Sequence, residues 1–302
     1  MIGIRNCVAA LLFCNSFAYS PAASAGALSG DASGYCQPST DLGAVVQDQL
    51  LQVTHTVKRE LEQSGHRMAL VSRSGLRLQR FDLRYSHAGI SLKHNTHGAW
   101  SVRQLYFACD ENRPRIFDQG MAGFVMGANQ PEGGHISIVF LPSEAAQPLE
   151  NAALDNARAL QLLGNTYSAN AYPFSPLYQN CNQWVIELMA SAWGNLTLQP
   201  AQENQLRQSA QQWLQAENYQ PSTIQIGWLP LMWVSSIVPW LHTDDHPDED
   251  WNAAQYRTSM PQSIEAFVRT RHPQAQRVEI CYTEDTIHIH RGWEALPDGC
   301  KD

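Results

Sequence analysis

The sequence has few basic residues and lacks the common motifs of several enzyme classes. It contains 20 Lys and Arg residues against 28 Asp and Glu residues. Nucleic acid is therefore not an expected partner, because binding a phosphate backbone needs concentrated positive charge. There is no H-E-x-x-H, C-x-x-C, G-x-S-x-G or phosphate-binding glycine loop. Their absence excludes the common forms of zinc proteases, dithiol oxidoreductases, serine hydrolases and nucleotide enzymes, and no cofactor is expected.

The chain also lacks an apolar run long enough to cross a bilayer. The apolar stretch over residues 8–19 follows the basic residue Arg5 and precedes small residues with A-x-A spacing that end at Ala25. This pattern predicts a signal peptide over residues 1–25, cleaved after Ala25. We therefore expect a periplasmic or secreted protein with no transmembrane span.

Cysteine is scarce, and its number is odd once the signal peptide is removed. The five that remain are Cys36, Cys109, Cys181, Cys281 and Cys300. In an oxidising compartment the simplest interpretation is two disulfides and one free thiol. The sequence does not give the connectivity, but pairing Cys36 with Cys109 and Cys281 with Cys300 would leave Cys181 alone.

Hydrophobic periodicity predicts an α+β fold. Apolar residues recur at helical spacing over residues 41–63, and strand-like segments separated by Gly, Asn or Pro follow at 68–72, 76–81, 87–92, 100–107 and 135–141. Further helices are predicted at 149–163, 182–193, 201–217 and 261–270, with a last strand pair at 278–282 and 286–290. Runs of strands bracketed by helices, rather than strict alternation, indicate an antiparallel sheet. We expect a core domain over residues 26–200 and a C-terminal helical and strand extension over 201–302, packed on that core.

Cys181 stands where a helix is predicted to begin. A thiol attacks as the thiolate, which a neighbouring imidazole or a helix N-terminus favours. Val185 and Leu188 lie on the same helical face and would anchor it in the core. The Cys181 N–H would be a free helix-end donor, and with the preceding Gln179 and Asn180 it is our candidate for holding an oxyanion or substrate.

His87 is the expected base, because it begins a strand and two small residues, Ala88 and Gly89, follow it. A glycine within a strand often marks the close approach of another backbone. Centring the following turn on residues 95–96 pairs residues whose numbers sum to 191, which sets Gln104 opposite His87. A shift by one residue in each strand would bring Tyr106 there instead. Gln104 is our choice as third residue, because its carbonyl can accept the imidazole N–H.

These motifs resemble a known group of enzymes. Ser-His-Ala-Gly-Ile at 86–90, followed by Asn-Cys-Asn-Gln-Trp-Val at 180–185, is similar to the circularly permuted branch of papain-like cysteine enzymes, in which the histidine strand precedes the cysteine helix. That branch includes bacterial cell-wall amidase and peptidase relatives and the lecithin retinol acyltransferases, whose cysteine motif also reads Asn-Cys, two variable residues, an aromatic and Val. The chain looks closest to an uncharacterised family of exported bacterial proteins within the group, as Trp100-Ser101-Val102 and Cys109 also suggest.

The resemblance implies a permuted papain-like fold, with an antiparallel sheet packed against the helix that carries the cysteine. It makes Cys181 the nucleophile and His87 the base, and it places a polar third residue at or near Gln104. Relatives often have a histidine or an acidic residue at that third position, so Gln104 departs from the common pattern.

Other features have simpler interpretations. A buried free cysteine is usually a small apolar residue, and a lone histidine is more often structural. The run His242–Asp250 offers metal-binding side chains, but a solvated acidic loop is the more common outcome, and no metal site is predicted. The Trp-rich stretch Trp228–Leu241 is more often core, although an exposed stretch would suit peripheral contact with a membrane.

We therefore expect an exported cysteine hydrolase or acyltransferase that cleaves an amide, peptide or ester bond through an acyl-enzyme. A peptide or cell-wall fragment suits the compartment, and a lipid ester suits the resemblance to acyltransferases. The alternative is a non-catalytic binding or scaffold protein of the envelope that retains the fold.

Overall fold

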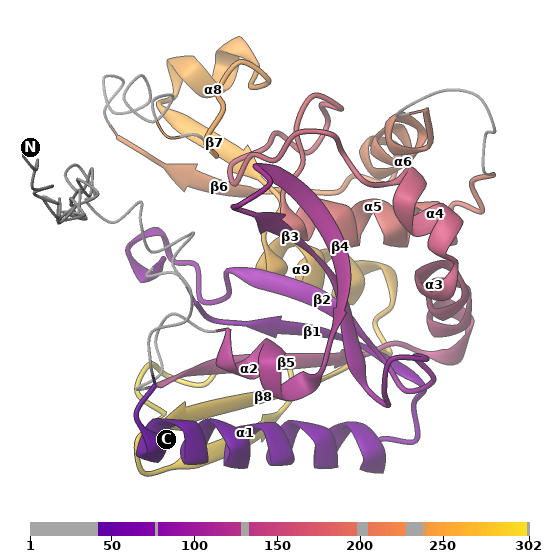
Figure 1. Cartoon of the computed structure of the whole chain (residues 1–302). Helices are drawn as coiled ribbons and strands as arrows, with labels where there is room; N and C mark the ends of the chain where they lie inside the picture. Colours follow the sequence, from indigo (N-terminus) through magenta and orange to yellow (C-terminus); the bar gives the residue numbers. More distant parts are fainter. Residues whose placement is uncertain are drawn as a thin grey trace, which may run out of the picture.

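The computed structural model describes residues 42–75, 78–127, 133–197, 205–227, 238 and 240–300. The predicted signal peptide and Cys36 lie outside these residues. The core of the fold is a seven-stranded antiparallel sheet in the order β4-β3-β2-β1-β5-β8-β9 (Figure 1). Its strands are β1 (Met68–Arg73), β2 (His87–Leu92), β3 (Ser101–Ala108), β4 (Arg113–Gln119), β5 (Gly133–Phe140), β8 (Gln276–Thr283) and β9 (Ile287–Arg291). The predicted α+β class is confirmed.

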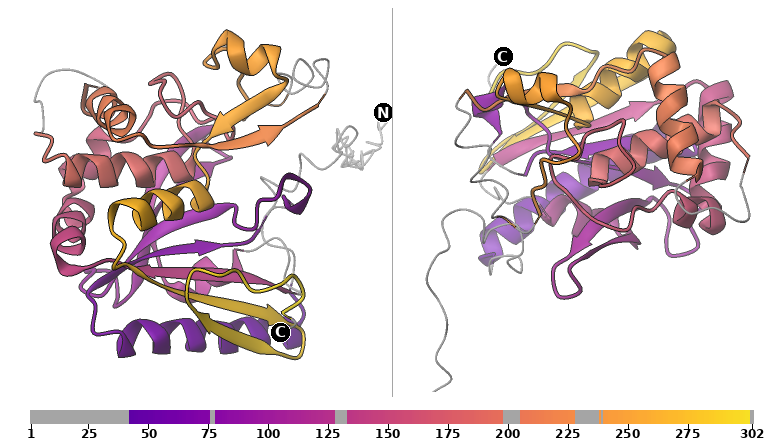
Figure 2. Two further views of the ribbon diagram at one scale, coloured as in Figure 1. Left: turned by 180° about the vertical axis from the view of Figure 1, so that it is seen from behind. Right: turned by 90° about the horizontal axis from the view of Figure 1, so that it is seen from above.

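Helices cover both faces of this sheet, as the views in Figure 2 show. The helices α1 (Ala44–Gln63) and α2 (Met121–Met126) pack on one face. The other face carries α3 (Ser143–Leu154), α4 (Asn156–Gln161), α5 (Cys181–Trp193), α6 (Gln205–Ala216) and α9 (Pro261–Arg271). A two-stranded sheet of β6 (Ser222–Gln225) and β7 (Gln255–Thr258) lies beside the short helix α8 (Asp248–Asn252).

The amino-acid pattern explains which helix is central. In α1 the buried apolar residues Leu50, Val53, Val57 and Leu61 follow a single stripe, as expected for a helix with one face on the core. In α5 every residue from Cys181 to Ser191 is buried. A helix covered on all sides belongs inside a fold, and here α5 packs between the sheet and the helices α3 and α6.

Several local predictions were wrong. Of the strand predicted at 76–81, residues 79–81 form the 3₁₀ turn η2 (Gln79–Phe81), which ends at Asp82 with φ of 57°. This segment could not pair with the preceding strand β1, because both edges of β1 are already paired, with β2 and β5. The helix predicted at 149–163 is two helices, because the Asp155 side chain accepts hydrogen bonds from the N–H groups of Ala157 and Arg158 and so begins α4.

The strands β4, β6 and β7 were not predicted from the sequence. Strand β4 contains Pro114 and several charged residues and lies at the edge of the sheet, where such residues are tolerated. Strands β8 and β9, from the segment predicted as a C-terminal extension, continue the main sheet beside β5.

The described cysteines separate into bonded and free. Cys281 and Cys300 form a disulfide, and Cys109 is also disulfide-bonded. Cys36, the partner predicted for Cys109, lies outside the described residues. Cys181 is free and buried. Within the described ranges no helix has the length and apolar character to span a membrane, and most of the Trp-rich stretch 228–241 falls outside them.

Thiol counting tests this arrangement. Protein that begins at residue 26, purified without reductant and then denatured, should show one free thiol, and Cys181→Ala should show none. Cys181 is the free cysteine among the described residues, and Cys36 is predicted to pair with Cys109. Ellman titration measures both values. Three or more free thiols would contradict the pairing.

Candidate functional site

Cys181 is the first residue of α5, and the residue before it caps the helix. The Asn180 side-chain carbonyl accepts a hydrogen bond from the Gln183 N–H at 2.7 Å. This contact satisfies one free donor of the first turn and fixes where the helix begins. The Cys181 side chain therefore lies at the helix N-terminus, with the whole residue only 6% exposed.

Burial dominates the chemistry of the thiol. It raises the pKa of Cys181 to about 11, since a thiolate loses its hydration in the core. The guanidinium of Arg73 acts in the opposite direction. So do the backbone N–H groups of Asn182 and Cys181 and the hydroxyl of Tyr167, which lower the pKa by stabilising the thiolate.

Asn182 fastens the beginning of α5 to the beginning of β2. Its Oδ1 accepts a hydrogen bond from the Ala88 N–H at 2.9 Å, and its Nδ2 donates to the Ser86 carbonyl at 3.2 Å. Both partners are immediate neighbours of His87, so one buried amide grips the chain on either side of the histidine. Cys181 and His87 consequently lie at the same end of the sheet.

His87 is held in one tautomer by Gln104. The distance from His87 Nε2 to Gln104 Oε1 is 2.5 Å. An amide carbonyl only accepts hydrogen bonds, so Nε2 carries the proton and Nδ1 keeps its lone pair. Burial and, after it, the charge of Arg73 lower the pKa of His87, the bond to Gln104 acts against both, and the resulting pKa is about 3. At neutral pH the ring is therefore an uncharged base.

The contact with Gln104 arises from a register that differs from the predicted one. Strands β2 and β3 pair Ile90 with Arg103 and Leu92 with Ser101, so paired numbers sum to 193 and the predicted sum of 191 is wrong. The cause is Trp100, which is fully buried, has φ of 62° and donates its backbone N–H to the Leu92 carbonyl at 2.9 Å.

Gly89 explains how Gln104 still reaches His87. In the observed register Gln104 is a diagonal neighbour of His87, and such neighbours meet only when long side chains have room. A Cβ at Gly89 would lie 2.5 Å from Val102 Cγ1 and 3.3 Å from Gln104 Cβ. Tyr106, the alternative third residue, is 40% exposed and packs on Phe117.

Gln119 continues the row of hydrogen bonds from His87 through Gln104, and it was not predicted from the sequence because β4 was not predicted. Gln104 Nε2 donates to Gln119 Oε1 at 2.7 Å, which orients the Gln104 amide with its carbonyl toward His87. A Cβ at Gly123 would lie 2.6 Å from Gln119 Nε2, so this glycine also leaves room for a polar side chain.

The loop before α5 uses its polar side chains to hold itself in place. Gln179 Nε2 donates to the Leu162 carbonyl at 2.8 Å, and its Oε1 accepts from the Gly164 N–H at 2.7 Å. Asn180 Nδ2 donates to Thr258 Oγ1 at 2.8 Å. The side-chain amides of Gln179 and Asn180 therefore make hydrogen bonds within the protein. Of the groups predicted to hold an oxyanion, the Cys181 N–H is the one that remains a candidate.

Residues 60–268 match the model of a family described as uncharacterised proteins conserved in bacteria, DUF2145. The chain belongs to the DUF2145 family. No curated protein and no solved structure matched it. These comparisons do not link the DUF2145 chain to papain-like enzymes, so that resemblance remains a prediction.

The acidic run at 242–250 of this DUF2145 protein is partly buried, contrary to the solvated loop expected. His246 Nδ1 lies 3.1 Å from Asp250 Oδ2, and His246 Nε2 lies 2.8 Å from the Asn170 carbonyl. Arg257 Nε donates to Asp250 Oδ1 at 2.6 Å. This network ties the loop before α5 to α8 and β7. In the described part of the chain no group of three or more His, Cys, Asp or Glu side chains is arranged to hold a metal ion.

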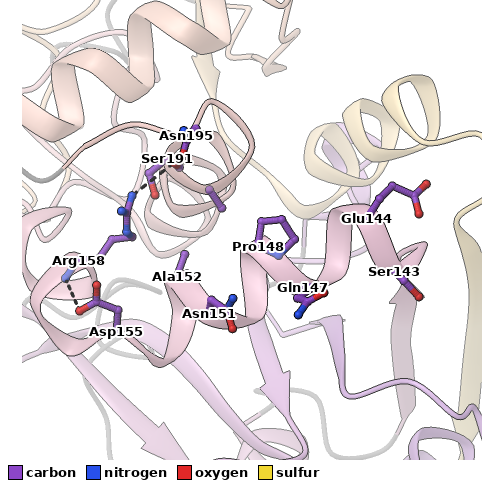
Figure 3. A pocket seen from close by; sticks show the side chains of 11 residues that line it. Ser143, Glu144, Gln147, Pro148, Asn151, Ala152, Asp155, Arg158, Ser191 and Asn195 are labelled. Carbon is purple, nitrogen blue, oxygen red and sulfur yellow. Dashed lines mark hydrogen bonds between the residues drawn. The ribbon is translucent and has the colours of Figure 1, made fainter.

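A polar groove of about 480 Å³ lies at the other end of α5, away from Cys181 (Figure 3). It lies where α3 and α4 meet the last turn of α5, and Glu144, Asn151, Asp155, Arg158 and Asn195 are among its lining residues. Arg158 Nη1 donates to the Leu196 carbonyl at 2.8 Å, so this arginine binds the chain that follows the C-terminus of α5.

Gly89→Ala should lower the free energy of unfolding by about 1–3 kcal/mol, because the added methyl group overpacks the contact with Val102. Urea unfolding measures the change. Gly43→Ala is the control for steric overlap, because a Cβ there meets nothing within 4 Å, and it should destabilise the protein less than Gly89→Ala although Gly43 is the N-cap of α1. Equal effects at both positions would contradict the close packing at Gly89.

Proposed function

We propose that this DUF2145 protein is an exported cysteine-dependent hydrolase or acyltransferase, with Cys181 as nucleophile and His87 as base. The observation that carries the proposal is the double hydrogen bond from Asn182, which joins the beginning of the Cys181 helix to the backbone on both sides of His87. The bond between His87 and Gln104 supports it, because it leaves Nδ1 as the basic atom.

The neutral state of both groups determines the order of events. His87 Nδ1 takes the thiol proton while Sγ attacks the carbonyl carbon of the substrate, because burial disfavours a thiolate formed beforehand. The Cys181 N–H stabilises the negative oxygen of the tetrahedral intermediate. His87 then returns the proton to the leaving amine or alcohol, which leaves a thioester on Cys181. Water or another acceptor attacks that thioester and releases the acyl group.

The substrate class follows from this chemistry. An acyl-enzyme forms from an amide, a peptide or an ester. A cell-wall peptide suits an exported protein, and the Cys281–Cys300 disulfide suits an oxidising compartment. A lipid ester suits the resemblance to acyltransferases. Export itself rests on the signal pattern at residues 1–25.

The second candidate function is a non-catalytic scaffold or binding protein of the envelope. It is favoured by the 6% exposure of Cys181 and by the rise of its pKa to about 11, which also describe an inert core cysteine. The two functions differ in whether His87 accelerates acyl transfer to Cys181.

Acyl-enzyme trapping separates them. Incubation with p-nitrophenyl acetate or p-nitrophenyl octanoate at neutral pH should add one acyl group at Cys181, detected by intact mass and peptide mapping. Cys181→Ala should remain unmodified. His87→Gln should acylate about 100-fold more slowly or worse, since general bases contribute at least that factor. His55→Gln, at an exposed position on α1, should match the wild type.

Equal acylation rates in the wild type and His87→Gln would contradict the nucleophile–base pair. Absence of acylation by either ester, with Cys181 still reactive after denaturation, would favour the scaffold.

A further inference from the structure

We infer that Arg73 is a further functional residue of this site, a positioning residue whose guanidinium favours negative charge on the reacting sulfur and proton release from His87. The inference rests on the proposed function, since it concerns the same cysteine and histidine. It adds a cationic side chain that neither the sequence motifs nor the family description indicates.

Arg73 is held directly beside His87. It is the last residue of β1 and pairs with His87, the first residue of β2, in the antiparallel ladder. Directly paired residues place their side chains on the same face of a sheet. The Arg73 Cζ lies 5.6 Å from the centre of the Phe124 ring, and the His87 ring lies 6.0 Å from the same ring. The guanidinium and the imidazole thus share one aromatic neighbour.

Two glycines make room for the guanidinium. A Cβ at Gly75 would lie 2.9 Å from Arg73 Nη1, and a Cβ at Gly127 would lie 3.0 Å from Nη2. Neither glycine has a positive φ, so the backbone conformation does not require glycine at these positions. A side chain is disfavoured there because the Arg73 guanidinium occupies the space it would need. The guanidinium is consequently confined between Gly75, Gly127 and Phe124, and this confinement fixes its charge near the site.

The charge acts on both proposed catalytic groups. After burial, the Arg73 guanidinium has the largest influence on the pKa of Cys181 and on that of His87, and it lowers both. Tyr167 lowers the pKa of Cys181 as well, and Tyr282 on β8, with a pKa raised to about 12, also lies within reach of the Arg73 charge. Because burial raises the pKa of Tyr282 to about 12, this tyrosine is neutral at physiological pH and does not cancel the charge of Arg73.

The chemical consequence concerns each proton transfer of the proposed reaction. As Sγ attacks, negative charge passes from sulfur to the carbonyl oxygen, and a fixed guanidinium stabilises it without reorganising. The imidazolium formed at the same time lies beside a second cation, so it is a stronger acid than usual. It therefore gives its proton to the leaving group instead of retaining it.

Alkylation by iodoacetamide tests the inference without an acyl substrate, because only the thiolate reacts. Rates at Cys181 should be measured from pH 7 to pH 10 in folded, non-reduced protein. Arg73→Gln should slow alkylation at every pH, by about tenfold for each unit by which the thiol pKa rises. Arg73→Lys, which keeps the charge, should recover much of the rate. The matched control is Arg67→Gln on the same chain segment, where the side chain is 61% exposed, and its rate should be unchanged.

A purely structural Arg73 gives a different result. Its loss would loosen the site and expose Cys181, so alkylation would become faster in Arg73→Gln and Arg73→Lys would not differ from it. That result, or an unchanged rate, would overturn the inference. If Arg73→Gln does not fold, Gly127→Ala provides a second test, because its methyl group displaces the guanidinium while the charge remains. It should slow alkylation, and an unchanged or faster rate would count against the inference.

The two proposals fail separately. If Arg73→Gln slows alkylation but no ester acylates Cys181, the charge effect holds and the enzymatic function is wrong. If the wild type forms the acyl-enzyme through His87 and Arg73→Gln changes neither alkylation nor acylation, the function holds and the role of Arg73 is wrong.

Discussion

The site depends on the buried side chain of Asn182. One amide accepts from the Ala88 N–H and donates to the Ser86 carbonyl, so the polar start of α5 and the start of β2 satisfy each other. A buried polar group left without a partner costs about 1–3 kcal/mol, which disfavours arrangements in which the helix and the strand separate. The positions of Cys181 and His87 follow from this contact, since each is covalently adjacent to it. A cysteine and a histidine far apart in the sequence are thereby brought to one end of the sheet.

Glycines shape the polar groups around His87. Gly89 and Gly123 leave room for Gln104 and Gln119, which reach diagonally between neighbouring strands. Gly75 and Gly127 do the same for the guanidinium of Arg73. These polar side chains lie on the face of the sheet that α1 and α2 cover with apolar residues. The low polarity of that environment explains why the imidazole is neutral. Cys181 belongs to the core on the other face of the sheet, where burial raises the pKa of its thiol, so in the proposed reaction the thiol loses its proton during the attack and not before it.

The parts that the sequence predicted well are those where local pattern and tertiary packing agree. Strand β2 has the predicted bounds, and α5 starts one residue before its predicted beginning. The register of β2 and β3 failed because a buried Trp100 with positive φ outweighs the turn centre inferred from composition. Strand β4, and with it Gln119, was missed because an edge strand tolerates Pro114 and charges that resemble a loop. Arg73 carries no sequence signal, since its role arises from pairing with His87 across two strands.

The central claim is that His87 is a neutral base whose Nδ1 is free to take the thiol proton. The nitrogen-15 chemical shifts of the His87 ring in labelled protein test it most directly, assigned by comparison with His87→Gln. The structure predicts a protonated Nε2 and an unprotonated Nδ1 from pH 5 to pH 8, because the pKa is lowered to about 3 and Gln104 accepts the Nε2 proton. A ring protonated on both nitrogens at neutral pH, or a tautomer with the proton on Nδ1, would contradict the account.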